Sequence, residues 1–190
     1  MLPKQIKPRN DTSGLCRPYG KTALPKGVCL MKALISGSFD PVTLGHTDII
    51  RRASELFEEV HVVIFSNPAK QYMFTKEQRL ELLTAACAEI NHVTVCASDS
   101  MPALYCRENG IGVIVRGIRS ESDFSYEYAL DAVNRSLVPT IQTVFLPARP
   151  ELSHISSSAA REMIRYRHAE SLYLPSSVLP MIRRFCGKQP

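Results

Sequence analysis

Five short runs rich in β-branched residues alternate with longer segments of helical period, and this alternation constrains the fold more than any other feature. The runs, which we predict to be strands, cover residues 33–35, 60–65, 93–95, 112–115 and 142–146. Such alternation is typical of βαβ units. We therefore predict an α/β fold: a single-domain, doubly wound (Rossmann-like) five-stranded parallel sheet with helices on both faces. Ligands of such sheets bind outside the carboxyl ends of the strands, so the site should follow Ile35, Phe65, Val115 and Leu146.

The predicted helices follow from apolar spacing and from capping residues. Helical spacing predicts the first helix at 47–59. Thr75, with Gln78 three residues later, makes a capping box that starts the second helix. Further helices are expected at 101–108 and 122–137, and two more near Ser156 and Ser176 with Pro175 between them. The positions expected to face the core in the first two helices are Ile49, Ile50, Ala53, Leu56, Phe57, Leu80, Leu83, Cys87 and Ile90.

The net charge of +5 is concentrated at the amino terminus. Residues 1–30 contain six basic residues and one acidic residue, whereas the remaining 17 basic and 17 acidic residues cancel. This segment also contains four prolines and no periodic apolar pattern, which predicts a disordered basic N-terminal extension ahead of a folded domain at 31–190. Because that domain is neutral overall, no general electrostatic argument favours nucleic-acid binding.

Cysteine spacing and hydropathy indicate the compartment. The six cysteines lack C-x-x-C spacing and the density of a disulfide scaffold, so we interpret most of them as small apolar residues in a reducing environment. No run approaches the roughly 20 apolar residues that span a bilayer, and no secretory or organelle targeting pattern is present. We therefore expect a cytoplasmic protein with no membrane role.

The most informative segment is G-S-F-D-P-V-T-L-G-H at residues 37–46, between the first strand and the first helix. Gly37 allows close backbone approach to a phosphate, and Ser38 offers a hydroxyl and an amide. His46 lies at a helix start, where the helix dipole favours anions. A turn with a capping histidine would explain an isolated T-x-G-H element, but the ten-residue combination in this position favours a polyphosphate site.

With these residues the chain resembles the T/H-x-G-H nucleotidyltransferase superfamily, and most closely the bacterial phosphopantetheine adenylyltransferases. The resemblance covers residues 31 to about 185, and it implies that 31–190 is a nucleotidyltransferase domain. It implies transfer of AMP from ATP to 4'-phosphopantetheine, with dephospho-CoA and pyrophosphate as products, in a homohexamer with feedback by coenzyme A. It also implies Mg²⁺ carried by the ATP phosphates, because no carboxylate cluster offers a dedicated metal site. His46 would be the catalytic residue, donating to the α-phosphate in the transition state.

Two further motifs carry the acceptor side of the resemblance. Lys70 precedes an M-F-T segment and matches a lysine that binds substrate phosphate in the family. An R-G-x-R-x-x-x-D-F-x-Y-E run at 116–127 assigns Arg116 to the pantetheine-side phosphate. Ser38 and Met101 are the other substrate-binding positions that the resemblance implies. A solvated loop lysine and arginines engaged in ordinary salt bridges remain alternatives.

The resemblance assigns the remaining motif residues to ATP. The I-S-S-S element at residues 155–158 opens a helix. Serines at a helix start cap the helix or offer hydroxyls and amides to phosphate, and the two roles are compatible. His154 lies outside that pattern, and we expect it in the preceding loop. The positions implied for ATP binding are Ser38, Phe39, His46, Gly117, Ile118, Arg119, Glu127, Leu152, Ser153, His154, Ile155, Ser156, Ser157 and Ser158.

Departures from the pattern are small, and three alternatives remain. Ser36 replaces a common proline, Leu44 a frequent asparagine and Leu152 a frequent tryptophan near the adenine. The nearest alternative is another nucleotidyltransferase of this superfamily, acting on nicotinamide mononucleotide or a polyol phosphate. A dinucleotide-dependent oxidoreductase is disfavoured because the first βα turn lacks G-x-G-x-x-G spacing. A non-catalytic nucleotide sensor is the third alternative.

Overall fold

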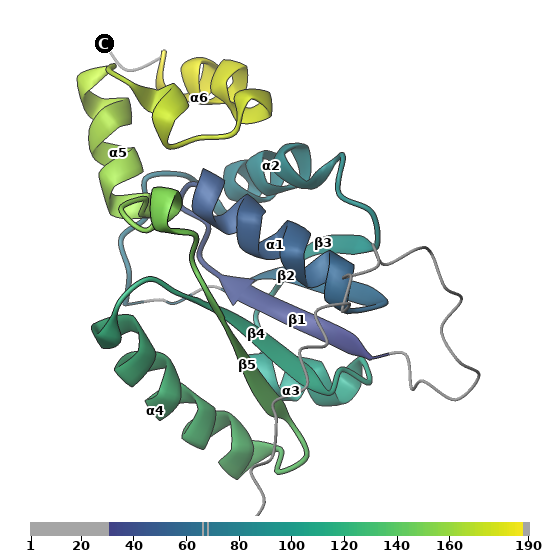
Figure 1. The fold of residues 1–190 in the computed structure, drawn as a ribbon. Coiled ribbons are helices and arrows are strands. Elements are labelled where there is room, and N and C mark those ends of the chain that lie inside the picture. Colours follow the sequence, from purple (N-terminus) through teal and green to yellow (C-terminus); the bar gives the residue numbers. More distant parts are fainter. Residues whose placement is uncertain (1–30, 66, 68, 188–190) are drawn as a thin grey trace, which may run out of the picture.

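The computed structural model describes residues 31–65, 67 and 69–187, so the predicted N-terminal extension at 1–30 lies outside the described residues. The described chain forms one sheet with helices on both faces (Figure 1). All neighbouring strands are parallel, in the order β3-β2-β1-β4-β5, which confirms the predicted fold class. The strands are β1 (Lys32–Gly37), β2 (Glu59–Phe65), β3 (Val93–Ser98), β4 (Val113–Ile118) and β5 (Gln142–Pro147).

Successive residues of a central strand enter two different cores, because side chains alternate between the faces of a sheet. In β1, Ala33 and Ile35 belong to the larger core and Leu34 to the smaller one. The larger core is covered by α1 (Leu44–Leu56), α2 (Lys76–Cys87), α5 (Ser157–Tyr166) and α6 (Leu179–Cys186). The opposite face carries α3 (Pro102–Glu108) and α4 (Glu121–Leu137), which contact each other. Three short 3-10 turns connect these elements: η1 (Pro150–Leu152), η2 (Glu170–Leu172) and η3 (Ser176–Val178).

The helix α1 lies three residues earlier than predicted, at 44–56 instead of 47–59. A reciprocal capping box between Thr43 and His46 starts it early, and Glu59, predicted as its last residue, already belongs to β2. The prediction that Leu56 faces the core is wrong, because this last helical residue is 64% exposed. The other residues predicted for this face are buried or packed against the core: Ile49, Ile50, Ala53 and Phe57.

The capping box predicted at Thr75 and Gln78 is confirmed, and α2 starts directly after it. Its buried face differs in part from the prediction. Leu80 is only partly buried, because the helix turns Arg79 inward instead, leaving that side chain 2% exposed. The other predicted core residues of this segment are buried, the last of them beyond the helix end: Leu83, Cys87 and Ile90.

The carboxyl-terminal helices follow the prediction with one shift. Ser156 caps α5 as expected. The segment that starts at Ser176 is the 3-10 turn η3, and the helix α6 itself begins only at Leu179. Pro175 precedes this turn and lies between the two helices, as predicted from its inability to continue a helix.

The four described cysteines are free thiols. Cys87 and Cys106 are buried, and burial raises the pKa of these thiols to about 11 and about 12. They therefore pack as small apolar residues, as the sequence predicted. Within 31–187, apart from the two residues not described, no helix combines the length and apolar character needed to cross a membrane.

Candidate active site

The carboxyl ends of β1 and β4 and the loops that follow β2 and β5 open on one cavity of about 600 Å³. The sequence predicted the site at this edge, because parallel strands bring their carboxyl ends together. The loops that follow these strands and the first turns of α1 and α5 form its wall. The predicted site residues that line it are Ser38, Phe39, His46, Lys70, Arg116, Gly117, Arg119, Glu127, Leu152, Ile155, Ser156, Ser157 and Ser158.

His46 is oriented by the helix cap that it helps to form. The Thr43 backbone N–H donates to His46 Nδ1 at 3.0 Å, and the His46 N–H donates to Thr43 Oγ1 at 3.4 Å. A backbone N–H can only donate, so Nδ1 is the unprotonated nitrogen and the imidazole proton lies on Nε2. The Phe39 ring packs edge-on against the imidazole, with 5.0 Å between the ring centroids. His46 therefore has one defined donor, Nε2–H, for a ligand in the cavity.

The electrostatic surroundings keep this imidazole neutral. Burial, followed by the positive charges of Arg119 and Arg116, lowers the pKa of His46 from 6.5 to about 4. Each of these causes disfavours the charged imidazolium. At neutral pH, His46 is thus suited to hydrogen-bond donation to an anion rather than to carrying a charge.

The loop after β1 is fixed from several sides by backbone contacts. The Asp40 carboxylate accepts the N–H groups of Met73 and Phe74 at 2.9 and 3.0 Å, which ties this loop to the M-F-T segment. Arg161 of α5 donates to the Asp40 carbonyl at 2.7 Å. Ser157 at the start of α5 donates to the Pro41 carbonyl at 2.9 Å. The conformation of the loop is therefore determined by segments more than 30 residues away.

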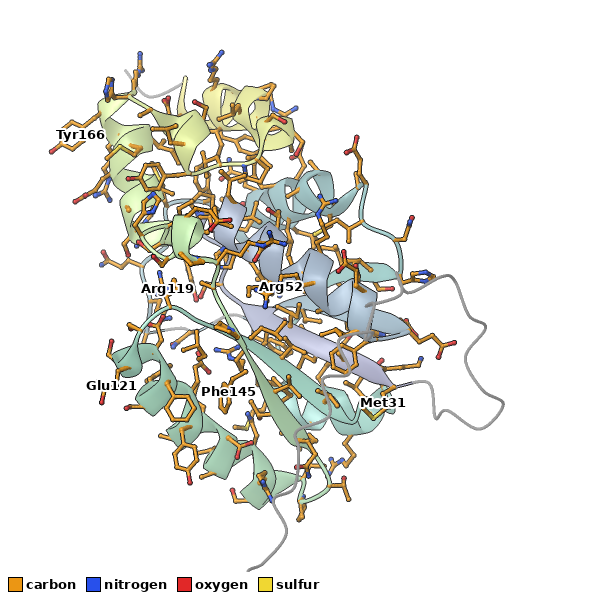
Figure 2. All side chains as sticks on the ribbon, in the orientation of Figure 1. Met31, Arg52, Arg119, Glu121, Phe145 and Tyr166 are labelled. Atoms are coloured by element: carbon orange, nitrogen blue, oxygen red, sulfur yellow. The ribbon has the colours of Figure 1, made fainter. Side chains whose placement is uncertain are left out.

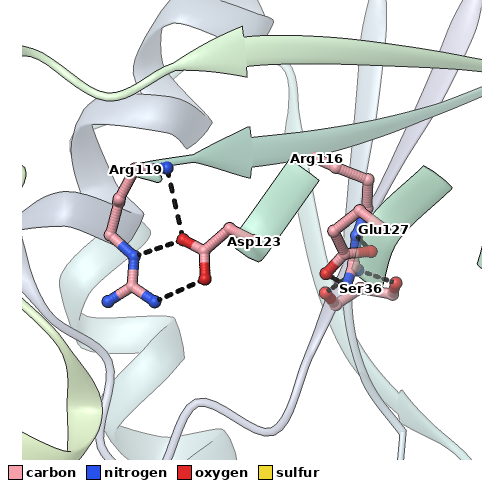
Figure 3. A network of polar contacts seen from close by, with 5 residues as sticks. All are labelled: Ser36, Arg116, Arg119, Asp123 and Glu127. Carbon is pink, nitrogen blue, oxygen red and sulfur yellow. Dashed lines mark hydrogen bonds and ion pairs between the residues drawn. The ribbon is translucent and has the colours of Figure 1, made fainter. Parts of the chain in front are cut away.

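Arg116 is held by partners on two sides (Figure 3). Its Nε donates to Glu127 at 2.6 Å and its Nη2 to the other oxygen of the same carboxylate. Its Nη1 donates to both the carbonyl and the hydroxyl of Ser36, each at 2.7 Å. The two side chains of the ion pair are only 21% and 13% exposed. This arrangement fixes the position of the guanidinium and partly neutralises it.

Arg119, labelled in Figure 2, follows β4 and pairs with Asp123 of α4 (Figure 3). It also contacts the segment just before α5. Its guanidinium pairs with both oxygens of Asp123, at 2.9 and 3.2 Å. Its Nη1 donates to the Ile155 carbonyl at 3.2 Å, directly before the serine-rich helix start. The salt-bridge alternative considered for these arginines is thus correct as a description of their partners, and both still line the cavity.

The three serines of the I-S-S-S element line the cavity, and each also has a structural contact. Ser156 caps α5 by accepting the Ala159 N–H at 3.1 Å. Ser157 donates to the loop after β1, and Ser158 accepts from Arg161 at 3.0 Å. The helix cap therefore leaves all three serines at the cavity wall, and their contact with a nucleotide stays a prediction.

Lys70 follows β2 and reaches the same cavity from an exposed loop. Its backbone N–H donates to the Asn67 carbonyl at 3.0 Å. No carboxylate of the described chain pairs with its ammonium. The charge of Lys70 is thus available to an anionic ligand.

Four predicted site residues do not line the cavity: Met101, Ile118, Ser153 and His154. Met101 occupies the residue position just before α3, without a capping hydrogen bond from its side chain, and is 48% exposed. The His154 ring packs against the Tyr173 ring, with 5.9 Å between the ring centroids. The Ser153 hydroxyl donates to the Pro150 carbonyl. Their assigned roles stay predictions.

Sequence reasoning also missed several residues of the wall. Ser36 and Arg161 line the cavity, as does Tyr72. Ser36 was considered only as a departure from the pattern, and it supplies two of the acceptors of Arg116. The signal for these residues is their position next to a motif, since no local pattern marks them.

Three carboxylates line the cavity: Asp40, Asp123 and Glu127. Each already accepts hydrogen bonds from backbone amides or from an arginine. In the described residues no cluster of three or more His, Cys, Asp or Glu side chains is placed to hold a metal ion. The donor set of the wall thus suits anions better than a bare cation.

Comparison with known proteins defines the class first. Residues 34–163 match the Cytidylyltransferase-like family, and the chain belongs to this class of nucleotidyltransferases. Among solved structures, the chain is similar to the lipopolysaccharide core biosynthesis protein from Thermoplasma volcanium, with 21% identity and a TM-score of 0.48, over 63% of this chain and 98% of that one.

The particular family follows from curated relatives. The chain is 44% identical over 162 residues to the phosphopantetheine adenylyltransferase of Symbiobacterium thermophilum, covering 85% of this chain and 100% of that protein. It is 41% identical over 155 residues to the phosphopantetheine adenylyltransferase of Synechococcus sp. strain WH7803, covering 82% and 94%. The chain belongs to the phosphopantetheine adenylyltransferase family, which confirms the resemblance in its motifs.

Proposed function

We propose that this protein reversibly transfers AMP from ATP to 4'-phosphopantetheine, giving dephospho-CoA and pyrophosphate in coenzyme A biosynthesis. One observation carries the proposal: His46 of α1, Lys70 of the loop after β2 and Arg116 of β4 line a single cavity. The identity of the acceptor is supported by relatives at 41–44% identity that carry this activity in their names.

The reaction needs positioning more than acid–base chemistry. A phosphate monoester has a second pKa of about 6 and is mostly dianionic at neutral pH, so it needs no general base. An oxygen of the acceptor phosphate forms a bond to the α-phosphorus of ATP. The bond from that phosphorus to the oxygen shared with the β-phosphate breaks, and pyrophosphate leaves. The protein must hold the groups in line and stabilise the negative charge that develops.

The residues divide into an acceptor side and a nucleotide side. Lys70 and Arg116 hold the acceptor phosphate, with Ser38 and Met101 as further substrate contacts. His46 donates from Nε2 to the α-phosphate oxygens, where charge develops. The nucleotide positions are those that the resemblance implies, including Gly117, Arg119 and the three serines. Ile118, Ser153 and His154, which lie off the cavity wall, are kept in this proposal as nucleotide contacts made once ATP is bound.

We further propose that Mg²⁺ enters as part of the substrate, bound to the phosphates of ATP and of the leaving pyrophosphate. In this proposal the carboxylates of the wall do not bind the ion, because each is already engaged by amides or arginines. The ion would neutralise phosphate charge, and the protein residues would orient the complex.

A single assay tests the proposed function: pyrophosphate release from Mg·ATP with and without 4'-phosphopantetheine. Release that depends on the acceptor supports it. ATP binding without release would instead support the sensor alternative. A panel of phosphorylated acceptors, including nicotinamide mononucleotide and polyol phosphates, tested with both ATP and CTP, distinguishes the related transferases.

We also propose that the chain assembles as a homohexamer, and α4 supports self-association. No residue of this helix is buried in the described chain. Its large apolar side chains are 39–63% exposed: Phe124, Tyr126, Tyr128, Val133 and Leu137. An exposed apolar stripe of this kind marks an interaction surface. Light scattering should give six times the 21.2 kDa chain mass, and a monomeric mass would contradict the assembly.

Feedback by coenzyme A and a cytoplasmic location complete the proposal. Coenzyme A contains the pantetheine phosphate and adenine groups of the product, so it should compete for the same cavity. A rise in the KM for ATP or for the acceptor with added coenzyme A would support this, and unchanged kinetics would contradict it. Cell fractionation tests the location.

A further inference from the structure

Arg79 is the most deeply buried cation of the described chain, and the roles assigned above do not use it. It is 2% exposed, on a helix whose other buried residues are apolar or thiol side chains. Burying a charge is unfavourable unless it is paired. Among the described residues no carboxylate lies within ion-pairing distance of Arg79, and its Nε is buried without a hydrogen-bond partner. Packing alone therefore does not account for an arginine here.

Two contacts show where the guanidinium is directed. Its Nη1 donates to the Ser38 carbonyl at 2.7 Å, within the loop predicted to bind polyphosphate. Its Cζ lies 4.0 Å from the centroid of the Tyr72 ring, within the range of a cation–π contact. Ser38 and Tyr72 both line the cavity, whereas Arg79 does not. Arg79 thus lies directly behind the wall of the site.

Tyr72 in turn holds the loop that carries Lys70. Its hydroxyl accepts the Asn67 N–H at 2.9 Å and donates to the Asn67 carbonyl at 3.2 Å. The Lys70 N–H donates to the same carbonyl at 3.0 Å. The Arg79 guanidinium therefore supports two loops. It contacts the Ser38 loop through the Ser38 carbonyl, and the Lys70 loop through the Tyr72 ring.

We propose that Arg79 is a positioning residue that holds the Ser38 loop and the Lys70 loop in register, and that bound substrate phosphates balance its charge. For the identity of the two substrates this inference rests on the proposed function. Because the interior screens charges weakly, a cation behind Ser38 favours an anion at the cavity face of that loop without touching it. This explains why Arg79 has no carboxylate partner in the free protein, since the bound ligand supplies the balancing negative charge.

The test separates the charge from the ring contact. Arg79→Met keeps a long side chain and removes the charge, so the KM values for both ATP and the acceptor should rise about tenfold, more than kcat falls. The melting temperature of the free protein should change little, because the loss of the contacts with Ser38 and Tyr72 is offset by the removal of a buried charge that has no ionic partner. The rise in melting temperature on adding ATP or pyrophosphate should shrink.

Arg79→Lys keeps the charge and a donor for Ser38 but stacks poorly on an aromatic ring. The KM for ATP should therefore return toward the parent value, while the KM for the acceptor stays raised. Lys76→Met is the matched control, because it removes a partly exposed cation of the same helix that pairs with Asp99. This control should leave both KM values and both thermal shifts unchanged.

Unchanged KM values in Arg79→Met would overturn the proposal. So would a lower melting temperature of the free protein with the ATP-induced shift intact, since that pattern describes a residue needed only for packing. If Arg79→Met fails to fold, Tyr72→Leu tests the acceptor half, and it should raise the KM for the acceptor alone. Thermal shifts with ATP and pyrophosphate require no acceptor, so they test Arg79 even if 4'-phosphopantetheine is not the substrate.

Discussion

Removing the imidazole of His46 should remove one preorganised donor, and the structure allows the size of the effect to be worked out. The Thr43 N–H occupies Nδ1, so only Nε2–H is available to the α-phosphate. Loss of a single donor of this kind lowers kcat by on the order of a hundredfold or more, about 2.7 kcal/mol of transition-state stabilisation. We expect this result for His46→Ala, with a modest change in KM.

His46→Gln separates catalysis from the helix cap. Glutamine three residues after a threonine is the usual partner in a capping box, so this variant keeps the contact that starts α1. It should retain the melting temperature of the parent protein while losing kcat as His46→Ala does. A variant that recovers kcat would show that the imidazole itself is not required, since glutamine keeps the cap and still offers an amide N–H donor.

The protonation state of His46 also has a thermodynamic consequence. Its pKa in the folded protein is about 4, below the ordinary 6.5, so the unfolded chain binds a proton first as the pH falls. The resulting contribution to the free energy of unfolding is fully present above pH 6.5 and is lost as the pH falls toward 4. At 1.36 kcal/mol per pH unit it is at most about 3 kcal/mol.

Two measurements check this account of His46. An NMR titration of the imidazoles, with His46→Gln to assign the resonance, gives the pKa directly. Denaturant unfolding between pH 4 and pH 7 should show a steeper loss of stability at low pH in the parent protein than in His46→Gln. A His46 pKa near 6.5, or a kcat of His46→Ala within about threefold of the parent, would refute the reasoning.

Three further predictions concern other residues of the cavity wall. Lys70→Ala should raise the acceptor KM about tenfold, measured with 4'-phosphopantetheine, and leave the ATP KM nearly unchanged; acceptor kinetics at the parent level would reject the assignment. Glu127→Gln removes the ionic partner of Arg116 and should lower kcat/KM for the acceptor about tenfold in initial-rate assays, with Glu121→Gln on the same helix as control. Gly117→Ala places a methyl group 3.0 Å from Ile49 Cγ1, so it should destabilise the protein by about 1–3 kcal/mol in denaturant unfolding, less so in an Ile49→Ala background.

The location of the site could be predicted because it depends on regular geometry. Strand periodicity identified the five strands, and a parallel order brings their carboxyl ends to one edge. The Thr75–Gln78 cap was predictable because both partners lie within one helical turn and match a common pair. The equivalent cap at Thr43 was missed because a histidine replaces the usual Glu or Gln, and the predicted start of α1 was therefore wrong by three residues.

Contacts between segments far apart in the sequence could not be predicted in this way. An arginine in a helical pattern is expected at the surface, and nothing near Arg79 shows that Ser38 and Tyr72 will lie against it. Ser36 was noted only as a departure, and its contact with Arg116 depends on the alignment of β1 with β4. Such contacts follow from register and packing of whole elements, which local patterns do not encode.

The carboxylates of the cavity add negative charge to a site whose function depends on binding anions, and their contacts explain why they are there. Glu127 and Asp123 each fix an arginine through two hydrogen bonds, and Asp40 joins two loops through backbone amides. A freely moving arginine would bind a phosphate in many geometries, and only one of them is in line with the α-phosphorus. Partial neutralisation should also weaken the binding of substrate and of leaving pyrophosphate alike, and affinity of this uniform kind does not speed the reaction. A site built this way gives up ground-state affinity and retains orientation, so removing a carboxylate should impair turnover even though it makes the cavity more positive.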